Sequence, residues 1–243
     1  MLVIPKTIHY CWFGCGQKSK LMQKCFASWK KFCPDFKIIE WNENNFDLTQ
    51  SPYLLSRYER KQWAFLSDYA RLLIIEENGG LYLDTDVEVV RPLDELLQFD
   101  AFFGFERNEY INTGQGFGAV AGHPAVRAMA SVYETLVPEP FGNYPIVACP
   151  AFNTQALVPH GLKRDGSRQT VLGAEILPQE YLCPYNDETG KLSLTKHTYS
   201  VHWYGKSWFR KRDLIRNRVT RPLHRFFGTD FILFKLMRKM RNR

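Results

Sequence analysis

The chain has 243 residues, of which 45% are hydrophobic and 23% are charged, a composition that supports a folded core and excludes a largely disordered protein. No run of 18 uncharged apolar residues occurs, and the first ten residues lack the basic start and long apolar core of a signal peptide. We therefore expect a cytoplasmic protein without a membrane-spanning helix. Its six cysteines have no regular spacing and no CxxC pair, so we expect free thiols.

The net charge of +7 is unevenly distributed along the chain. Residues 206–243 carry +11 and residues 1–205 carry −4, so the basic surface belongs to a tail and not to a nucleic-acid-binding core. The last 15 residues mix basic and apolar side chains, which is typical of a short amphipathic helix on an anionic membrane surface. We predict one domain over residues 1–208 and a basic, membrane-surface-associated helical tail over 209–243. A solvated terminal helix and a nucleic-acid patch are the alternatives for the tail.

The N-terminal region alternates strand and helix patterns. Residues 3–13 predict a strand that ends in a loop at Gly14, with His9 in the core. Residues 18–32 carry apolar side chains at helical spacing, and residues 36–41 predict a second strand. This order favours a parallel sheet whose ligands bind beyond the carboxyl ends of the strands.

The later segments predict further helices and strands. They are a helix over 60–80 that ends at Gly79 or Gly80, strands over 81–90 and 102–106, a helix over 123–137 and a long loop or cap over 138–157. The strand over 81–90 contains two aspartates separated by one residue, Asp84 and Asp86. In an extended strand they share a face with Cα atoms about 7 Å apart, where they repel each other unless a cation lies between them. A hard divalent ion with oxygen ligands would remove that repulsion.

Other interpretations of the acidic pair remain open. A solvated strand edge also carries acidic residues. A calcium loop is disfavoured because its sixth position, counted from Asp84, is Val89 and not glycine. A haloacid-dehalogenase-type phosphatase also has an apolar strand followed by Asp-x-Asp, although Glu88 stands where that class usually has Thr or Val.

Residues 67–90, SDYARLLIIEENGGLYLDTDVEVV, resemble the signature of glycosyltransferase family 32 and its relatives, which include the yeast initiating mannosyltransferase and the clostridial glucosylating toxins. The matching positions are Ser67, Asp68, Arg71, Gly79, Gly80, Tyr82, Asp84 and Asp86. Residues 4–14, 118–126 and 202–208 are similar to other blocks of the family, so the resemblance spans roughly residues 3–208.

The resemblance implies an α/β fold of the GT-A type, with a mixed central sheet flanked by helices, and a bound Mn²⁺ or Mg²⁺. It implies that Trp12 stacks on the donor base, although Trp12 could instead be a core residue. Asp68 and Arg71 would hold the sugar hydroxyls and the diphosphate, Asp84 would contact ribose and sugar, and Asp86 would bind the metal. The ion would neutralise the charge of a leaving nucleoside diphosphate.

The remaining site predictions concern the later part of the chain. We expect His202 to complete the metal site, although relatives that use a carboxylate there leave this position open. Further donor contacts are predicted at Tyr82, Lys206 and Trp208, and acceptor contacts at Asn112, Gln115, Asn153 and Thr154.

Together these features predict a retaining, metal-dependent glycosyltransferase. It would move a hexose from a nucleotide diphosphate sugar, with UDP-hexose favoured, to a glycan or lipid-linked oligosaccharide in surface polysaccharide synthesis. Its expected place is the cytoplasmic face of the membrane. A metal-dependent phosphatase and a non-enzymatic membrane-surface binding module are the alternative functions.

Overall fold

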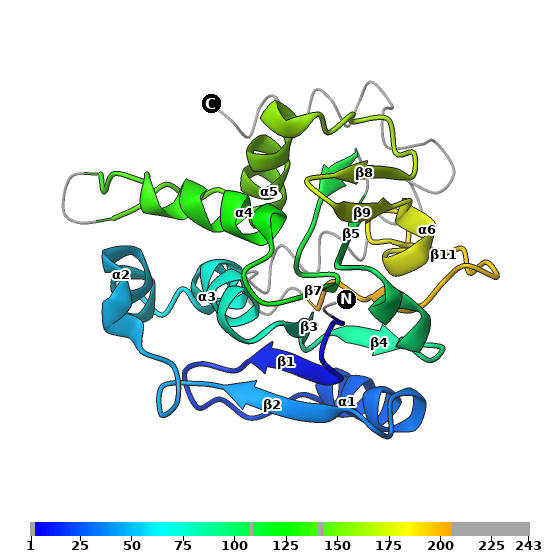
Figure 1. Ribbon diagram of the computed structural model, residues 1–243. Helices are drawn as coiled ribbons and strands as arrows, with labels where there is room; N and C mark the ends of the chain where they lie inside the picture. The colour runs from blue at the N-terminus through cyan, green and yellow to red at the C-terminus, as the bar shows by residue number, and fades with distance from the viewer. Residues whose placement is uncertain (1–2, 107–108, 140–142, 206–243) are drawn as a thin grey trace, which may run out of the picture.

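The computed structural model describes residues 3–106, 109–139 and 143–205 (Figure 1). The strands are β1 Thr7–Cys11, β2 Lys37–Trp41, β3 Gly80–Tyr82, β4 Val87–Val89, β5 Ala101–Glu106, β6 Tyr110–Ile111, β7 Phe117–Ala119, β8 Gln169–Val171, β9 Ala174–Leu177, β10 Tyr185–Asn186, β11 Lys191–Leu192 and β12 Ser200–His202. The α-helices are α1 Lys20–Phe32, α2 Pro52–Glu59, α3 Trp63–Asn78, α4 Pro124–Glu134, α5 Cys149–Leu157 and α6 Gln179–Leu182. The predicted contacts at Lys206 and Trp208 and the predicted tail lie outside these residues.

A mixed sheet forms the centre of the molecule, in the order β2-β1-β3-β7-β5-β9-β8, with β6 paired to β5. β1 is parallel to both β2 and β3, whereas β7 runs antiparallel to β3 and β5. β1, β3 and β5 therefore point the same way, and their carboxyl ends meet at one edge of the sheet. A separate antiparallel pair joins β4 to β12 near that edge.

The predicted N-terminal β-α-β unit is confirmed. α1 begins at a capping box in which the Ser19 side chain accepts from the Met22 N–H and Met22 sulfur faces the Ser19 N–H. The buried face of α1 carries Trp29, whose indole N–H donates to the carbonyl of Val87 over 2.8 Å. This bond attaches α1 to β4, and so to the segment that contains the acidic pair.

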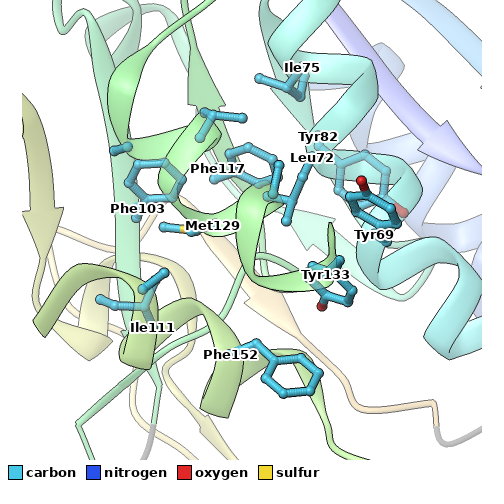
Figure 2. Packing of buried hydrophobic residues seen from close by; sticks show 14 of the residues in the cluster. Tyr69, Leu72, Ile75, Tyr82, Phe103, Ile111, Phe117, Met129, Tyr133 and Phe152 are labelled. Carbon is cyan, nitrogen blue, oxygen red and sulfur yellow. The ribbon is translucent and has the colours of Figure 1, made fainter. Parts of the chain in front are cut away.

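Buried hydrophobic side chains form two clusters, one on each face of the sheet. In β5, Phe103 and Phe105 belong to one cluster and Phe102 to the other, as the alternation of a strand requires. Figure 2 shows the first cluster, in which α3, α4 and α5 contribute Leu72, Met129 and other side chains that pack against the sheet. The helices flank the sheet as predicted, and no helix of the described chain combines the length and apolar character needed to span a membrane.

Two predicted segments differ from the structure. Residues 81–90 are not one strand, because β3 ends at Tyr82 and β4 begins at Val87, with a turn between them. Hence the two aspartates lie in a loop and do not alternate along a pleat. The predicted long loop over 138–157 contains α5, which has a proline in its first turn and a buried face that includes Phe152 and Leu157. The proline and glycine residues that indicated a loop precede this helix or open it.

The end of α3 was predicted in outline. The helix stops at Asn78, and Gly79 follows with φ +63° and ψ −168°. The positive φ favours glycine as expected, but this ψ lies outside the left-handed helical region, so the chain turns directly into β3. The predicted core position of His9 is confirmed, since its side chain is 2% exposed and accepts from the Trp41 indole.

Candidate active site

The acidic pair lies in the loop between β3 and β4, at the edge where the parallel strands end. The Leu83 N–H donates to the carbonyl of His9 in β1, which fixes the start of this loop to the main sheet. The Val87 N–H donates to the carbonyl of Asp84 over 3.0 Å and closes the turn. β12 then pairs with β4 so that His202 stands opposite Val87, which brings a histidine from a distant part of the sequence beside the two aspartates.

Asp84, Asp86 and His202 form a cluster that could hold a metal ion. Each side chain offers one ligand atom, and the three atoms lie within 4.8 Å of one another. His202 Nε2 lies 3.4 Å from Asp86 Oδ1, while His202 Nδ1 is buried and has no hydrogen-bond partner among the described residues. Two carboxylates and an imidazole suit a divalent ion such as Mn²⁺ or Mg²⁺. The residues therefore fit the predicted ion.

The charged groups of this cluster shift one another's pKa values. Burial alone would lower the pKa of His202, but the neighbouring Asp86 and Asp84 carboxylates raise it above its ordinary value. The pKa of Asp86 is lowered despite burial, because His202 and the Gly205 N–H stabilise its charged form. In the protein without a metal, the two carboxylates therefore favour the protonated form of His202, and a metal ion that binds this imidazole would displace the proton.

Arg71 fixes the orientation of Asp84. Its Nη2 lies 3.0 Å from Asp68 Oδ1 and 3.1 Å from Asp84 Oδ1, and the guanidinium lies over the ring of Tyr82 with 4.9 Å to the centroid. The Tyr82 hydroxyl donates to the same oxygen of Asp84 over 3.0 Å. Arg71 is 2% exposed, so it is held by its partners and not by solvent. Asp68 and Arg71 share one face of α3 as their spacing predicts.

The segment 111–115 packs against this ion pair from the other side. The Asp84 N–H donates to the carbonyl of Gly114, and the Gly114 N–H donates to the Asn112 side chain over 2.7 Å. A Cβ at Gly114 would lie 2.5 Å from Asp84 Oδ2 and 3.0 Å from Arg71 Nη1. Only glycine allows the backbone to approach the carboxylate this closely.

The four predicted acceptor residues are buried, and they either belong to this segment or pack against it from α5. Asn112 donates to Glu106, Gln115 to the carbonyl of Phe105 and Asn153 to Thr113, while the Thr154 hydroxyl accepts from the Ile111 N–H. In this structure their side chains support the segment from within, and their role as acceptor contacts stays a prediction.

Trp12 lies at the same edge of the sheet, directly after β1. Its side chain is half-buried. Its backbone N–H donates to the carbonyl of Trp41, and its indole N–H donates to the carbonyl of Gly16 over 2.9 Å. A Cβ at Gly14, which has φ +84°, would lie 2.6 Å from the ring of Trp63. The loop after β1 is thus held against α3 and presents a partly exposed indole, but base stacking by Trp12 stays a prediction.

Three residues of the site were not found from the sequence. Cys149 at the start of α5 lies 3.6 Å from Arg71 through its sulfur, the Gly205 N–H donates to Asp86 Oδ2 over 2.6 Å, and Glu106 ends β5 beside Asn112. The position of Glu106 at the end of an apolar strand was a signal in the sequence that could have identified it. The other two depend on contacts between distant segments.

Comparisons with known proteins agree with this geometry. Residues 19–103 match the family described as "Glycosyltransferase sugar-binding region containing DXD motif". Inositol phosphoceramide mannosyltransferase 3 of Schizosaccharomyces pombe is 30% identical over 129 residues, which is 50% of this chain and 35% of that protein. Mannosyl phosphorylinositol ceramide synthase SUR1 of Saccharomyces cerevisiae is 30% identical over 108 residues, 41% of this chain and 27% of that protein. The match therefore spans only about a third of these yeast relatives.

A solved structure supports the fold. The PaToxG glycosyltransferase superposes with a TM-score of 0.50 at 19% identity, over 65% of this chain and 69% of that chain. The mixed sheet with flanking helices is the expected GT-A-type arrangement. Residues 19–103 are therefore similar to the DXD-containing sugar-binding region of a glycosyltransferase family, in line with the sequence resemblance.

Proposed function

We propose that this protein is a retaining glycosyltransferase that uses a divalent ion to transfer a hexose from a nucleotide diphosphate sugar. The single observation that carries the proposal is the cluster of Asp84, Asp86 and His202, whose ligand atoms lie within 4.8 Å of one another. This cluster lies beside a buried arginine and at the sheet edge where ligands of α/β proteins bind.

The proposed metal site has a defined chemical role. Asp84, Asp86 and His202 would hold Mn²⁺ or Mg²⁺, and the ion would neutralise the charge that develops on the leaving nucleoside diphosphate. Arg71 would add a second, permanent positive charge next to the diphosphate. Because Arg71 is already fixed by two carboxylates, little reorganisation is needed when the donor binds.

The other donor contacts follow from position. Trp12 would stack on the base, Asp68 and Arg71 would contact the sugar and diphosphate, and Asp84 would contact ribose and sugar, with Tyr82 holding Asp84 in place. Every one of these residues comes from the carboxyl end of β1, from β3 and the loop after it, or from α3. UDP-hexose is the favoured donor. No side chain is assigned as a covalent nucleophile, so we favour departure and attack on the same face of the sugar.

The acceptor is proposed to be a glycan or a lipid-linked oligosaccharide. Two relatives are named for mannosyl transfer to inositol phosphoceramide, which supports an acceptor that carries a lipid. The basic residues 209–243 would hold the enzyme at the cytoplasmic face of an anionic membrane, where such an acceptor is located.

Metal affinity is expected to rise with pH. Burial raises the pKa of Asp84 to about 6, although Arg71 lowers it, and Asp86 raises it further. Protonated Asp84 thus stabilises the metal-free protein at low pH, and this contribution is lost as pH rises from 3.8 to about 6. Metal binding requires that Asp84 and His202 release their protons, so Mn²⁺ affinity should rise with pH, by at most about tenfold per pH unit for each group below its pKa, and should level off above it. Calorimetric titrations at pH 6 and 7.5 measure this, and equal affinities would contradict it.

Hydrolysis of the donor tests the proposed activity without knowledge of the acceptor. We expect one member of a panel of UDP- and GDP-hexoses to be cleaved in the presence of Mn²⁺ and to be protected by a chelator. The sugar released first should keep the anomeric configuration of the donor, which NMR detects. Release of phosphate from simple phosphoesters, without donor cleavage, would instead favour a metal phosphatase.

A further inference from the structure

We propose that Glu106 is a positioning residue for the metal site, because its carboxylate accepts hydrogen bonds from two separate segments. One is residues 111–115, which pack against Asp84, and the other is residues 200–205, which contain His202 and contact Asp86. This inference rests on the proposed metal site. Glu106 is the last residue of β5, and one of its oxygens, Oε2, accepts from the Asn112 amide over 2.8 Å and from the Tyr204 hydroxyl over 3.2 Å. The two donors belong to segments that are about 90 residues apart in the sequence.

The first connection runs from Glu106 to Asp84. The Asn112 amide that donates to Glu106 belongs to a side chain whose oxygen accepts from the Gly114 N–H over 2.7 Å. The Gly114 carbonyl in turn accepts from the Asp84 N–H, and a Cβ at Gly114 would lie only 2.5 Å from Asp84 Oδ2, so this backbone lies directly against the carboxylate. Asn112 can present its oxygen to Gly114 only while its amide nitrogen faces an acceptor, and Glu106 is that acceptor.

The second connection runs from Glu106 to His202 and Asp86. The ring of Tyr204 lies 4.1 Å from the imidazole of His202 between centroids, with 32° between the ring planes. The next residue, Gly205, donates its N–H to Asp86 Oδ2 over 2.6 Å. Tyr204 thus packs against His202, which would bind the metal, and directly precedes Gly205, whose N–H orients the second metal-binding residue, Asp86.

The backbone of Tyr204 shows that this arrangement needs support. Its φ is +50°, which is uncommon for a bulky residue and persists only where the surroundings fix it. The hydroxyl supplies that support, since it contacts Glu106 Oε2 and also lies 3.0 Å from the sulfur of Cys183. Removal of the bond to Glu106 would let the ring and the following glycine move, and with them the imidazole and the Asp86 carboxylate.

The test compares Mn²⁺ affinity in four variants of the full chain by calorimetry. Tyr204→Phe keeps the ring but removes the hydroxyl, and Glu106→Ala removes the acceptor of both bonds. Each should weaken Mn²⁺ binding by about tenfold or more, the usual effect of losing a group that orients a metal ligand. Glu106→Gln keeps an oxygen that can accept both bonds and should bind Mn²⁺ within about twofold of the wild type, because its acceptor geometry is preserved.

Tyr199→Phe is the matched control, since the Tyr199 hydroxyl also donates to a glutamate, Glu95, and the substitution leaves both the bonds of Glu106 and the backbone pairing of Tyr199 with Val90 in place. It should leave Mn²⁺ affinity unchanged. Thermal melts of the metal-free variants identify any general loss of stability.

Four results would overturn the inference. Wild-type affinity in Tyr204→Phe would show that the hydroxyl does not position the site. Equal weakening in Glu106→Gln and Glu106→Ala would show that the charge acts and not the hydrogen-bond geometry. Absence of Mn²⁺ binding in the wild-type protein would reject the proposed metal site itself, and with it the role of Glu106. Intact Mn²⁺ binding in the wild type, with unchanged affinity in all variants, would reject the role of Glu106 alone.

Discussion

Asp86→Asn is expected to reduce Mn²⁺-dependent donor cleavage by on the order of 10²–10³-fold or more while the protein remains folded. The carboxylate of Asp86 faces His202, and its pKa lies below the ordinary value, whereas that of Asp84 is raised, so Asp86 is the more readily ionised carboxylate of the cluster. Asparagine retains an oxygen that can accept from the Gly205 N–H, so the local hydrogen bond survives while the charge is lost. Steady-state kinetics of donor hydrolysis and a thermal melt measure the two effects.

Glu88→Gln is the matched control for this prediction. Glu88 stands two residues after Asp86, but its carboxylate pairs with Lys24 over 2.7 Å and accepts from the Trp203 indole, outside the metal cluster. Its removal should leave donor cleavage within about threefold of the wild type, since a partly exposed ion pair contributes little. Full activity in Asp86→Asn, or equal loss in both variants, would contradict the assignment of Asp86 to the metal.

Arg71→Ala is expected to cause the largest loss of stability. The Arg71 side chain is 3% exposed and forms ion pairs with Asp68 and Asp84, whose side chains are 12% and 27% exposed. Its removal leaves two poorly solvated carboxylates without their arginine partner, which costs about 3–5 kcal/mol, toward the lower end because Asp84 retains some solvent contact and the bond from Tyr82. For a domain of this size that corresponds to a fall in Tm of roughly 6–20 °C.

The pH dependence of this loss identifies its cause. Without Arg71 the pKa values of Asp68 and Asp84, already raised by burial, would rise further, so protonation would relieve the unpaired charges. The stability difference from the wild type should therefore shrink as pH falls from about 7 to about 5. Arg127→Ala is the control, since that arginine pairs with Glu76 at an exposed position and its loss should cost less than about 1 kcal/mol. A Tm deficit that is the same at both pH values would contradict the electrostatic explanation.

The sequence predicted those parts of the fold that depend on local patterns. The strand, helix and second strand between Thr7 and Trp41 follow from periodicity and capping, and so do α3 and α4. The break between β3 and β4 was missed because the apolar run continues through residues 81–90, whereas the pairing partners change from β1 to β12. Pairing between distant segments leaves no local signal in the sequence.

The residues of the candidate site likewise fall into those that local spacing predicts and those that depend on contacts between distant segments. Asp68 and Arg71 meet Asp84 because a helix and the following strand bring nearby positions together, and their spacing could be read directly. His202 was predicted only through the family resemblance, and its place beside Asp86 depends on β12 pairing with β4 across more than 100 residues. Gly205 joins the site through a tertiary contact alone, whereas Glu106 had one local signal, its place at the end of an apolar strand, and neither residue was predicted.

The most direct test of the central claim is a calorimetric titration of UDP and GDP into the wild-type and Asp86→Asn proteins, with Mn²⁺ or with a chelator. If the cluster of Asp84, Asp86 and His202 holds an ion that contacts the diphosphate, one nucleotide should bind the wild type at least about tenfold more tightly with Mn²⁺. That enhancement should be absent in Asp86→Asn. Nucleotide binding that is equal with Mn²⁺ and with chelator in the wild type would contradict the claim.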